Sequence, residues 1–298
     1  MLNVTEITCQ QALNRINSKF LPFAWDLNIY RGCQHGCIYC YAIYSHDYLE
    51  AGSFSDDIYV KVNIVEQLER QLSSPRWKGG TINIGGVTDS YQPLEAKYKF
   101  MPDIFKLLIK HKTPCTISTK SDLMLRDYDL IDELSKIASV NVSATITCAD
   151  AGTRKKIEPL GKDALEKFHM LKEFAKTGAS TGFHHMPIVP YITDKKEDIE
   201  QLYACAADSK VGYVLTGVLY LRGKTRKVFF DAIAREYPEL LQALRHLYQK
   251  REAYKAYGEA LYQGVINGLR RKYGLRSYAN PGKGGAKEKE ESKQLTLF

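Results

Sequence analysis

The sequence predicts an α/β protein built on a parallel sheet. Between residues 27 and 221, short apolar strand patterns alternate with amphipathic helix patterns, which is the order of βα units. The first strand pattern runs directly into a cysteine-rich loop, and in parallel barrels the functional residues follow the carboxyl ends of the strands. Six units are too few to close an eight-stranded barrel, so an open architecture is expected.

The element boundaries follow from apolar periodicity and from breaking residues. Strands are expected at 27–30, 81–84, 113–119, 140–146, 181–189 (interrupted by Pro187) and 211–221. Helices are expected at 60–72, 102–110, 121–137, 162–176 and 194–207. Pro102 suits the first turn of one helix, and Gly178 suits the end of another.

The remaining segments differ in composition. Residues 1–24 look like a lead-in in which Pro22 breaks any helix, and 25–221 form the βα region. Residues 222–278 are helical in pattern and rich in Tyr, Lys and Arg. Residues 279–298 begin with a Gly-rich linker and continue with a charged stretch, so we expect a flexible tail.

Composition limits the class of protein. The 298 residues are 44% apolar and 26% charged, which is an ordinary globular balance, and no apolar run is long enough to cross a bilayer. The N-terminus lacks a secretory pattern, so we expect a cytoplasmic protein. Seven cysteines, three of them clustered, favour metal binding over a disulfide framework. The net charge of +8 is compatible with a polyanionic partner.

The cysteine cluster has the spacing C-x3-C-x2-C, at Cys33, Cys37 and Cys40, with no fourth cysteine nearby. A structural zinc site needs four ligands, whereas an iron–sulfur cluster on three thiolates keeps one iron open for a ligand. The alternative is a zinc loop completed by His35 or His46.

The triad, with Tyr39 before its last cysteine, resembles the radical S-adenosylmethionine (SAM) superfamily. The longer pattern N-x-Y-R-G-C-x-H-G-C-x-Y-C-Y-A resembles its spore-photoproduct-lyase-like branch, also called DNA repair photolyase-like proteins. The resemblance implies a partial (β/α)6 barrel with a helical C-terminal extension. It also implies a [4Fe-4S] cluster on the three cysteines and SAM as cofactors, with an electron donor such as flavodoxin or ferredoxin.

The same resemblance implies a function. The reduced cluster would cleave SAM to a 5′-deoxyadenosyl radical, which abstracts hydrogen from a substrate, here expected to be DNA in a lyase-like repair reaction. Spore photoproduct lyase has a hydrogen-donating cysteine at the end of its second strand, where this chain has Gly86. The alternatives are a peptide or metabolite substrate, or a non-catalytic metal-loop protein that binds nucleic acid.

The second and third strands end in candidate SAM ligands. The second strand ends Gly85-Gly86-Val87-Thr88-Asp89, where glycines permit close approach and the polar residues could accept an ammonium group. The resemblance puts this strand end beside the methionine moiety. It also gives Lys120 the role of pairing with the SAM carboxylate. The alternatives are a glycine turn with Asp89 as a cap and a solvated lysine.

Later strands contribute further candidates. Asn141 and Ser143 share one face of a strand and suit a ribose or carboxylate, or else a satisfied core network. Arg154 and Glu158 match an R-x3-E-P element near the SAM site in the family, and could equally form a structural ion pair. Pro187 begins a P-I-x-P element that contacts adenine in the family.

The catalytic group itself is open. His184 and His185 point to opposite faces of one strand, so at most one faces the site, where it could bind phosphate or move protons. Tyr39, Tyr41 and Tyr91 are candidates for relaying a hydrogen atom. Packed or exposed histidines are the alternative.

The C-terminal region suggests partners. Basic residues at 222–227 and 245–276 are interleaved with tyrosines, a mixture that suits nucleic acid or an ordinary amphipathic helix pair. The last five residues, Gln294 to Phe298, resemble the peptide that binds the bacterial sliding clamp.

Overall fold

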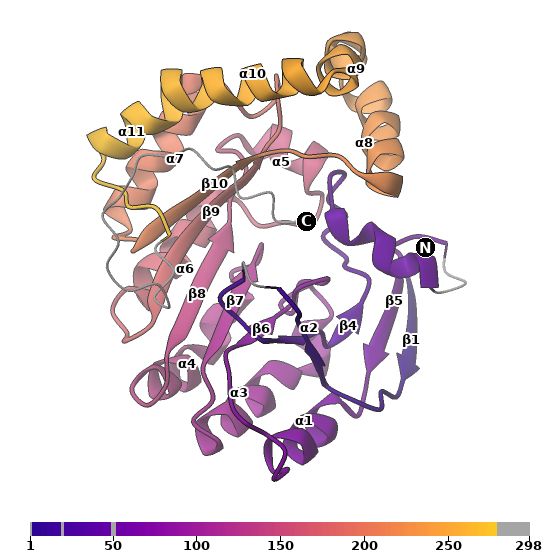
Figure 1. The fold of residues 1–298 in the computed structure, drawn as a ribbon, viewed down its shortest axis with the longest axis vertical. Helices are drawn as coiled ribbons and strands as arrows, with labels where there is room; N and C mark the ends of the chain where they lie inside the picture. Colours follow the sequence, from indigo (N-terminus) through magenta and orange to yellow (C-terminus); the bar gives the residue numbers. More distant parts are fainter. Residues whose placement is uncertain (1, 19–20, 49–51, 279–298) are drawn as a thin grey trace.

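A computed structural model describes residues 2–18, 21–48 and 52–278 of the chain. A curved seven-stranded sheet forms its centre, in the order β10-β9-β8-β7-β6-β3-β2 (Figure 1). Its strands are β2 (Leu13–Arg15), β3 (Trp25–Leu27), β6 (Ile82–Ile84), β7 (Cys115–Thr119), β8 (Val140–Thr145), β9 (Ser180–Ile188) and β10 (Tyr213–Val218). The last six pair in parallel, while β2 runs antiparallel to β3. The open six-unit barrel predicted from the sequence is therefore confirmed.

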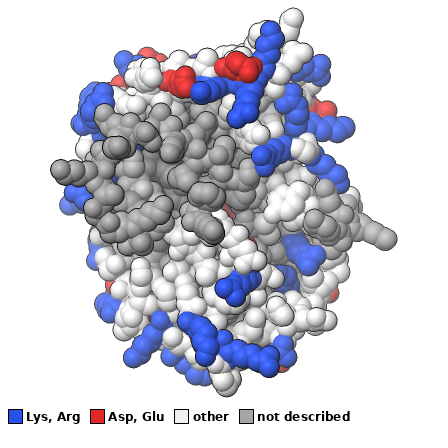
Figure 2. Space-filling view, in the orientation of Figure 1, with Lys and Arg blue, Asp and Glu red and all other residues white. Residues whose placement is uncertain are grey.

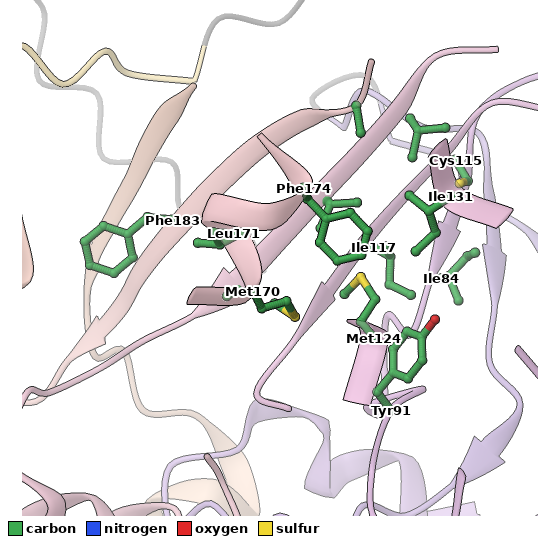
Figure 3. Close-up of a cluster of buried hydrophobic side chains, with 14 of the residues drawn as sticks. Ile84, Tyr91, Cys115, Ile117, Met124, Ile131, Met170, Leu171, Phe174 and Phe183 are labelled. Carbon is green, nitrogen blue, oxygen red and sulfur yellow. The ribbon is translucent and has the colours of Figure 1, made fainter. Parts of the chain in front are cut away.

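Helices follow the strands and cover the convex side of the sheet. They are α1 (Ile64–Leu72), α2 (Glu95–Tyr98), α3 (Phe100–Lys110), η2 (Leu123–Asp127), α4 (Tyr128–Ser135), α5 (Ala151–Ile157), α6 (Ala164–Phe174) and α7 (Lys196–Asp208). Strand residues that face these helices are apolar, as Ile117 and Phe183 show against Ile131, Leu171 and Phe174 (Figure 3). Because side chains alternate along a strand, the opposite, polar set faces the interior of the barrel.

A second, smaller sheet carries the cysteine loop. It has the order β1-β5-β4, from β1 (Asn3–Ile7), β5 (Asp57–Lys61) and β4 (Tyr30–Arg31). The predicted first strand at 27–30 is thus split between two sheets, and the lead-in contains two strands. The expected helix at 60–72 begins only at Ile64, because Val60 and Lys61 belong to β5.

The C-terminal extension is helical, as expected. It consists of α8 (Gly223–Glu236), η3 (Pro238–Leu240), α9 (Leu241–Gln249), α10 (Arg251–Leu261), the π-helical turn η4 (Tyr262–Ile266) and α11 (Asn267–Lys272). In Figure 1 this arm arches over the end of the sheet formed by β9 and β10. The tail expected at 279–298, with its clamp-like peptide, lies outside the described residues.

Tyrosines fasten this arm to the barrel. The hydroxyls of Tyr248, Tyr254 and Tyr262 donate to backbone carbonyls of 216–219, at 2.7, 3.3 and 2.6 Å. The Tyr257 hydroxyl donates to Asp194 on the loop after β9. These rings are thereby used for packing, which accounts for the interleaved tyrosines without base stacking.

Candidate active site

The cysteine loop follows β4 and lies at the carboxyl ends of the barrel strands. Cys33 N–H donates to the carbonyl of Phe54 at 3.0 Å, and Ile38 N–H donates to that of Ile157 at 3.1 Å. Gly32 has a φ of +84°, and a Cβ there would lie within 2.9 Å of two carbonyl oxygens. Only glycine permits this sharp entry into the loop.

Side chains from the loop after β6 hold the cysteine loop from the other side. The Thr88 hydroxyl donates to the carbonyl of Gly32 at 2.6 Å. The fully buried Gln92 accepts from the N–H of Gln34 at 2.9 Å. Thr88 is thus engaged with the loop backbone, and the two loops form one hydrogen-bonded unit.

His35 and Asp89 extend this unit toward β7. His35 is buried, its Nδ1 donates to the carbonyl of Leu160 at 3.0 Å, and its Nε2 lies 3.0 Å from Asp89 Oδ2 in a close electrostatic contact. Asp89 also accepts from the Thr119 hydroxyl and the Lys120 N–H, both at 2.8 Å. Burial alone would raise the pKa of the Asp89 carboxyl, but His35 and these donors outweigh it and bring the pKa to about 2.

Both carboxylate oxygens of Asp89 are therefore engaged by donors from the protein itself. Its Oδ1 also accepts from the N–H of Tyr91 at 2.9 Å, which makes three N–H or O–H donors besides the His35 ring. This arrangement fixes the backbone at Lys120 and makes Asp89 a positioning group in the described structure.

The two histidines weighed as zinc ligands are engaged elsewhere. His46 Nε2 lies 3.0 Å from the carbonyl of Asp57, and its ring packs on Phe54. In the described part of the chain, no three Cys, His, Asp or Glu side chains are placed to hold a single metal ion. Thiolates on a four-iron cluster each bind a different iron, so they need not converge on one point.

The thiols lie in an environment that disfavours a bare thiolate. Burial raises the pKa of Cys33 to about 12 and also raises the pKa values of Cys37 and Cys40. The charge of Lys120 acts in the opposite direction on the last two. Bound iron would replace the thiol protons, and the thiolates would then share the charge of the metal.

Lys120 follows β7 and reaches over the Tyr39 ring, with Nζ 5.9 Å from the ring centre. Burial would lower its pKa, but the charges of Cys37, Glu158 and Asp89 outweigh this and raise it. Among the ion pairs within 4.0 Å in the described residues, none involves this ammonium group. Lys120 is therefore a cation beside the triad that has no ion-pair partner within 4.0 Å in the part of the chain that the structure describes.

The glycines after β6 face the protein. Gly85 has a φ of +87°, and a Cβ on Gly86 would lie 2.5 Å from the Asp26 carboxylate. That carboxylate accepts from the amides of Asn28 and Asn83, at 2.6 and 2.8 Å. The space left by Gly86 is thus filled by Asp26.

Inward-facing residues of β7 to β10 form a hydrogen-bonded chain across the barrel. His184 lies 3.1 Å from the Ser118 hydroxyl and 3.1 Å from the Tyr213 hydroxyl, which in turn donates to Asn141 at 2.9 Å. Burial and then the charge of Lys120 lower the pKa of His184 to about 4, so it is neutral near pH 7. Ser143 is fully buried and donates to the carbonyl of Ile117 at 2.9 Å.

Arg154 and Glu158 have separate roles. Arg154 Nε donates to Asp163 at 2.7 Å and Nη1 to the carbonyl of Gly161 at 2.6 Å, so it ties the loop between α5 and α6. Glu158 is fully buried and accepts from the hydroxyls of Tyr39 and Thr147. Glu158 therefore lies at the hydroxyl end of the Tyr39 ring.

The remaining predicted site residues lie in four different environments. The Tyr41 hydroxyl donates to the carbonyl of Gly86, and its side chain is 42% exposed. Tyr91 is buried and donates to Asp127 at 2.8 Å, away from the triad. His185 is buried between Phe183 and Tyr203 on the helix side of β9. Pro187 is half-buried near the end of β9.

The family model of the radical SAM superfamily matches residues 27–204, more than half of the chain. The chain belongs to the radical SAM superfamily. Uncharacterized protein Rv2578c of Mycobacterium tuberculosis is 34% identical to it over 250 residues, covering 82% of this chain and 73% of the relative. Uncharacterized protein MJ0683 of Methanocaldococcus jannaschii is 28% identical over 268 residues, covering 90% and 94%.

The radical SAM fold is also evident from solved structures. A spore photoproduct lyase variant with bound AdoMet and dinucleoside spore photoproduct superposes with a TM-score of 0.59 at 13% identity, covering 79% of this chain and 66% of the lyase. The lyase complexed with the dinucleoside alone gives 0.58 at 14% identity, with the same coverage. At these identities the likeness establishes the shared fold.

A radical SAM enzyme uses a [4Fe-4S] cluster and SAM, and this site fits both. The three clustered thiols, of which Cys33 is buried and the other two half-buried, suit iron, and the nearby Lys120 ammonium suits a carboxylate.

Sequence reasoning missed Gln92 as a support, and it weighed His35 only as a zinc ligand. It also missed Thr225 at the start of α8, whose hydroxyl donates to the carbonyl of Cys40 at 2.9 Å. No helix in the described residues is both long and apolar enough to span a bilayer.

Proposed function

We propose that this radical SAM enzyme abstracts a hydrogen atom from a nucleic-acid substrate, probed first as DNA, in a repair-like reaction. The observation that carries the radical chemistry is the Lys120 ammonium beside one buried and two half-buried thiols, at the mouth of a polar barrel interior. The fold shared with spore photoproduct lyase, whose structures hold a dinucleoside photoproduct, supports nucleic acid as the substrate class.

The residues of this chain have distinct tasks in the proposal. Cys33, Cys37 and Cys40 hold the cluster, and Lys120 binds the carboxylate of SAM. Cluster and SAM together supply, when bound, a 5′-deoxyadenosyl radical that takes hydrogen from carbon. Asp89 and Glu158 position Lys120 and Tyr39, through the contacts given above.

The reaction differs from that of spore photoproduct lyase in the proposal. In the proposal, Gly86 matches the position of that enzyme's hydrogen-donating cysteine, and a Cβ on Gly86 would meet Asp26. Another group must therefore quench the product radical. Tyr41 is our candidate because its hydroxyl lies against the Gly86 carbonyl and its ring is partly exposed.

The test is anaerobic turnover of the reconstituted protein, reduced with dithionite and assayed for 5′-deoxyadenosine with and without DNA. We expect cleavage that DNA accelerates, and none in Cys37→Ala, which lacks one cluster ligand. DNA-independent cleavage would favour a peptide or metabolite substrate. A protein that binds zinc and no iron would refute the radical mechanism.

Two partners belong to the same proposal. A flavodoxin or ferredoxin would deliver the electron in place of dithionite. The residues Gln294 to Phe298 are proposed to bind the bacterial sliding clamp. Deleting them should abolish clamp binding in a pull-down with purified clamp and leave SAM cleavage intact.

A further inference from the structure

The helical arm carries a cavity that is lined by two arginines and, among the described residues, by no acid. A space of about 390 Å³ lies between α8 and α9, lined by Arg226, Phe230, Arg245 and Gln249. The guanidinium carbons of Arg226 and Arg245 lie 5.2 and 6.0 Å from the centre of the Phe230 ring. Two cations therefore share one small space with a common aromatic neighbour.

Neighbouring acids do not neutralise this pair. Among the described residues that line the cavity none is acidic. On the same helix Asp231 is 2.6 Å from Lys227, and Glu236 is 2.8 Å from Arg235. Glu239 lines an adjoining cavity that also includes Arg245, but no ion pair within 4.0 Å joins them. Like charges that line one cavity repel, and an anion bound between them would remove the repulsion.

The Arg226 side chain is held in place for such an anion. Arg226 donates through Nη1 to the Tyr248 carbonyl at 3.4 Å, which leaves its other donors available. Phe230 is buried, and Tyr248 packs edge-on against it. A planar guanidinium held over a ring is oriented to bind a phosphate through two donors.

The helix that lines the cavity, α8, also contacts the cysteine loop of the radical site. Thr225, the residue before Arg226, donates to the carbonyl of Cys40. Arg222 is the N-cap residue of α8, at the end of the helix that meets the cysteine loop. Figure 2 shows Lys and Arg gathered at the upper right of the molecule, where Figure 1 places α8 and α9.

We propose that Arg226 and Arg245 form a clamp for a backbone phosphate of the nucleic-acid substrate, which positions the strand beside the cluster loop. This inference rests on the proposed function and specifies where the substrate backbone is held. Contacts to phosphate carry no sequence information, so the clamp fixes position and not base identity. A nucleic-acid strand held at Arg226 would run along α8 toward the start of the helix, which contacts Cys40.

The test measures binding of a fluorescent single-stranded oligonucleotide and its duplex to the anaerobic holoenzyme over a range of salt concentrations. Arg226→Gln and Arg245→Gln should each weaken binding roughly tenfold, as expected for a lost hydrogen bond to a charged group. Each should also reduce the slope of log affinity against log salt by about 0.7 for the single strand. Arg226→Lys should keep the slope and lose part of the affinity.

The matched control is Arg235→Gln, because Arg235 lies nine residues after Arg226 and thus on the opposite side of α8. It should bind as the wild type does. Iron content and circular dichroism check that every variant is folded and loaded.

The outcomes separate the two proposals. If DNA accelerates SAM cleavage in the wild type but the clamp variants bind and respond as it does, the clamp is wrong and the proposed function stands. If the wild type neither binds nor responds to oligonucleotides, both are wrong. If inorganic phosphate competes as strongly per phosphate as the oligonucleotide, the site binds free phosphate and the backbone assignment is overturned.

Discussion

Replacing His185 by Phe should remove an acid-sensitive element from the core. His185 is fully buried, its ring stacks on Phe183 at 5.5 Å, and it meets Tyr203 edge-on at 5.7 Å. Neither ring nitrogen has a hydrogen-bond partner among the described residues. Burial alone lowers the pKa of His185 to about 3, so the ring is neutral in the folded protein.

The size of the effect follows from proton linkage. The unfolded chain binds a proton at this histidine with the ordinary pKa of 6.5, whereas the folded chain does not until about pH 3. The unfolded state therefore binds more protons in this window, and the free energy of unfolding decreases as the pH falls from 6.5 toward 3. At pH 5, 1.5 units below the ordinary value, the loss is about 2 kcal/mol.

The assay is anaerobic urea unfolding of wild type and His185→Phe holoproteins at pH 7.5 and 5.0, followed by tryptophan fluorescence. Trp25 and Trp77, in contact at 5.4 Å, report the transition. Other titrating groups and loss of the cluster are common to both proteins. Any crowding by the larger ring is independent of pH, so the change with pH isolates the histidine.

We expect the variant to gain about 2 kcal/mol relative to the wild type between pH 7.5 and pH 5.0. An equal difference between the two proteins at both pH values would refute the reasoning, because it would mean that His185 has a partner for its proton in the folded state. Unchanged SAM cleavage in the variant would also indicate that His185 takes no part in catalysis.

Three further changes test other parts of the site. Glu158→Gln should cost about 3–5 kcal/mol in thermal or urea unfolding, because it leaves the buried Lys167 ammonium, 3.8 Å away, without a charge partner; an effect below 1 kcal/mol would mean that the pair is not buried. Gly182→Ala should cost about 1–3 kcal/mol, since its Cβ would lie 2.2 Å from the Tyr213 ring, whereas Gly264→Ala meets nothing within 4 Å and should be neutral or stabilising; equal midpoints would contradict the packing. Lys120→Met should lower SAM affinity at least tenfold by equilibrium dialysis while iron content is retained; unchanged affinity would exclude the carboxylate contact.

Much of the barrel is predictable because its signals are local. The six parallel strands follow apolar periodicity, and the cysteine loop lies at strand ends because that is where parallel barrels place variable loops. The small sheet is not predictable in this way. β1 is almost wholly exposed, and it is a strand only because its backbone pairs with β5, more than fifty residues away.

The directions of side chains at the site are harder to predict than their positions. Thr88 and Asp89 are polar residues at a strand end, which is equally compatible with binding a ligand or supporting a loop. The structure shows that Thr88 bonds to Gly32 and that Asp89 bonds to Thr119 and the Lys120 backbone. These choices depend on the packing of loops from different units, about which a single sequence says nothing.

The balance of charge around the triad explains how the site is prepared for its cofactor. The carboxylates near it are already engaged: the half-buried Asp26 with two asparagine amides, and the buried Asp89 and Glu158 with hydroxyls and with backbone or lysine donors. Lys120 is the exception, because its ammonium lies near negative groups but has no ion-pair partner within 4.0 Å among the described residues. A half-buried cation in this position is stabilised when a ligand supplies the opposite charge. In the proposed function the carboxylate of SAM supplies it, whereas a loop that only held zinc would have no need of the lysine.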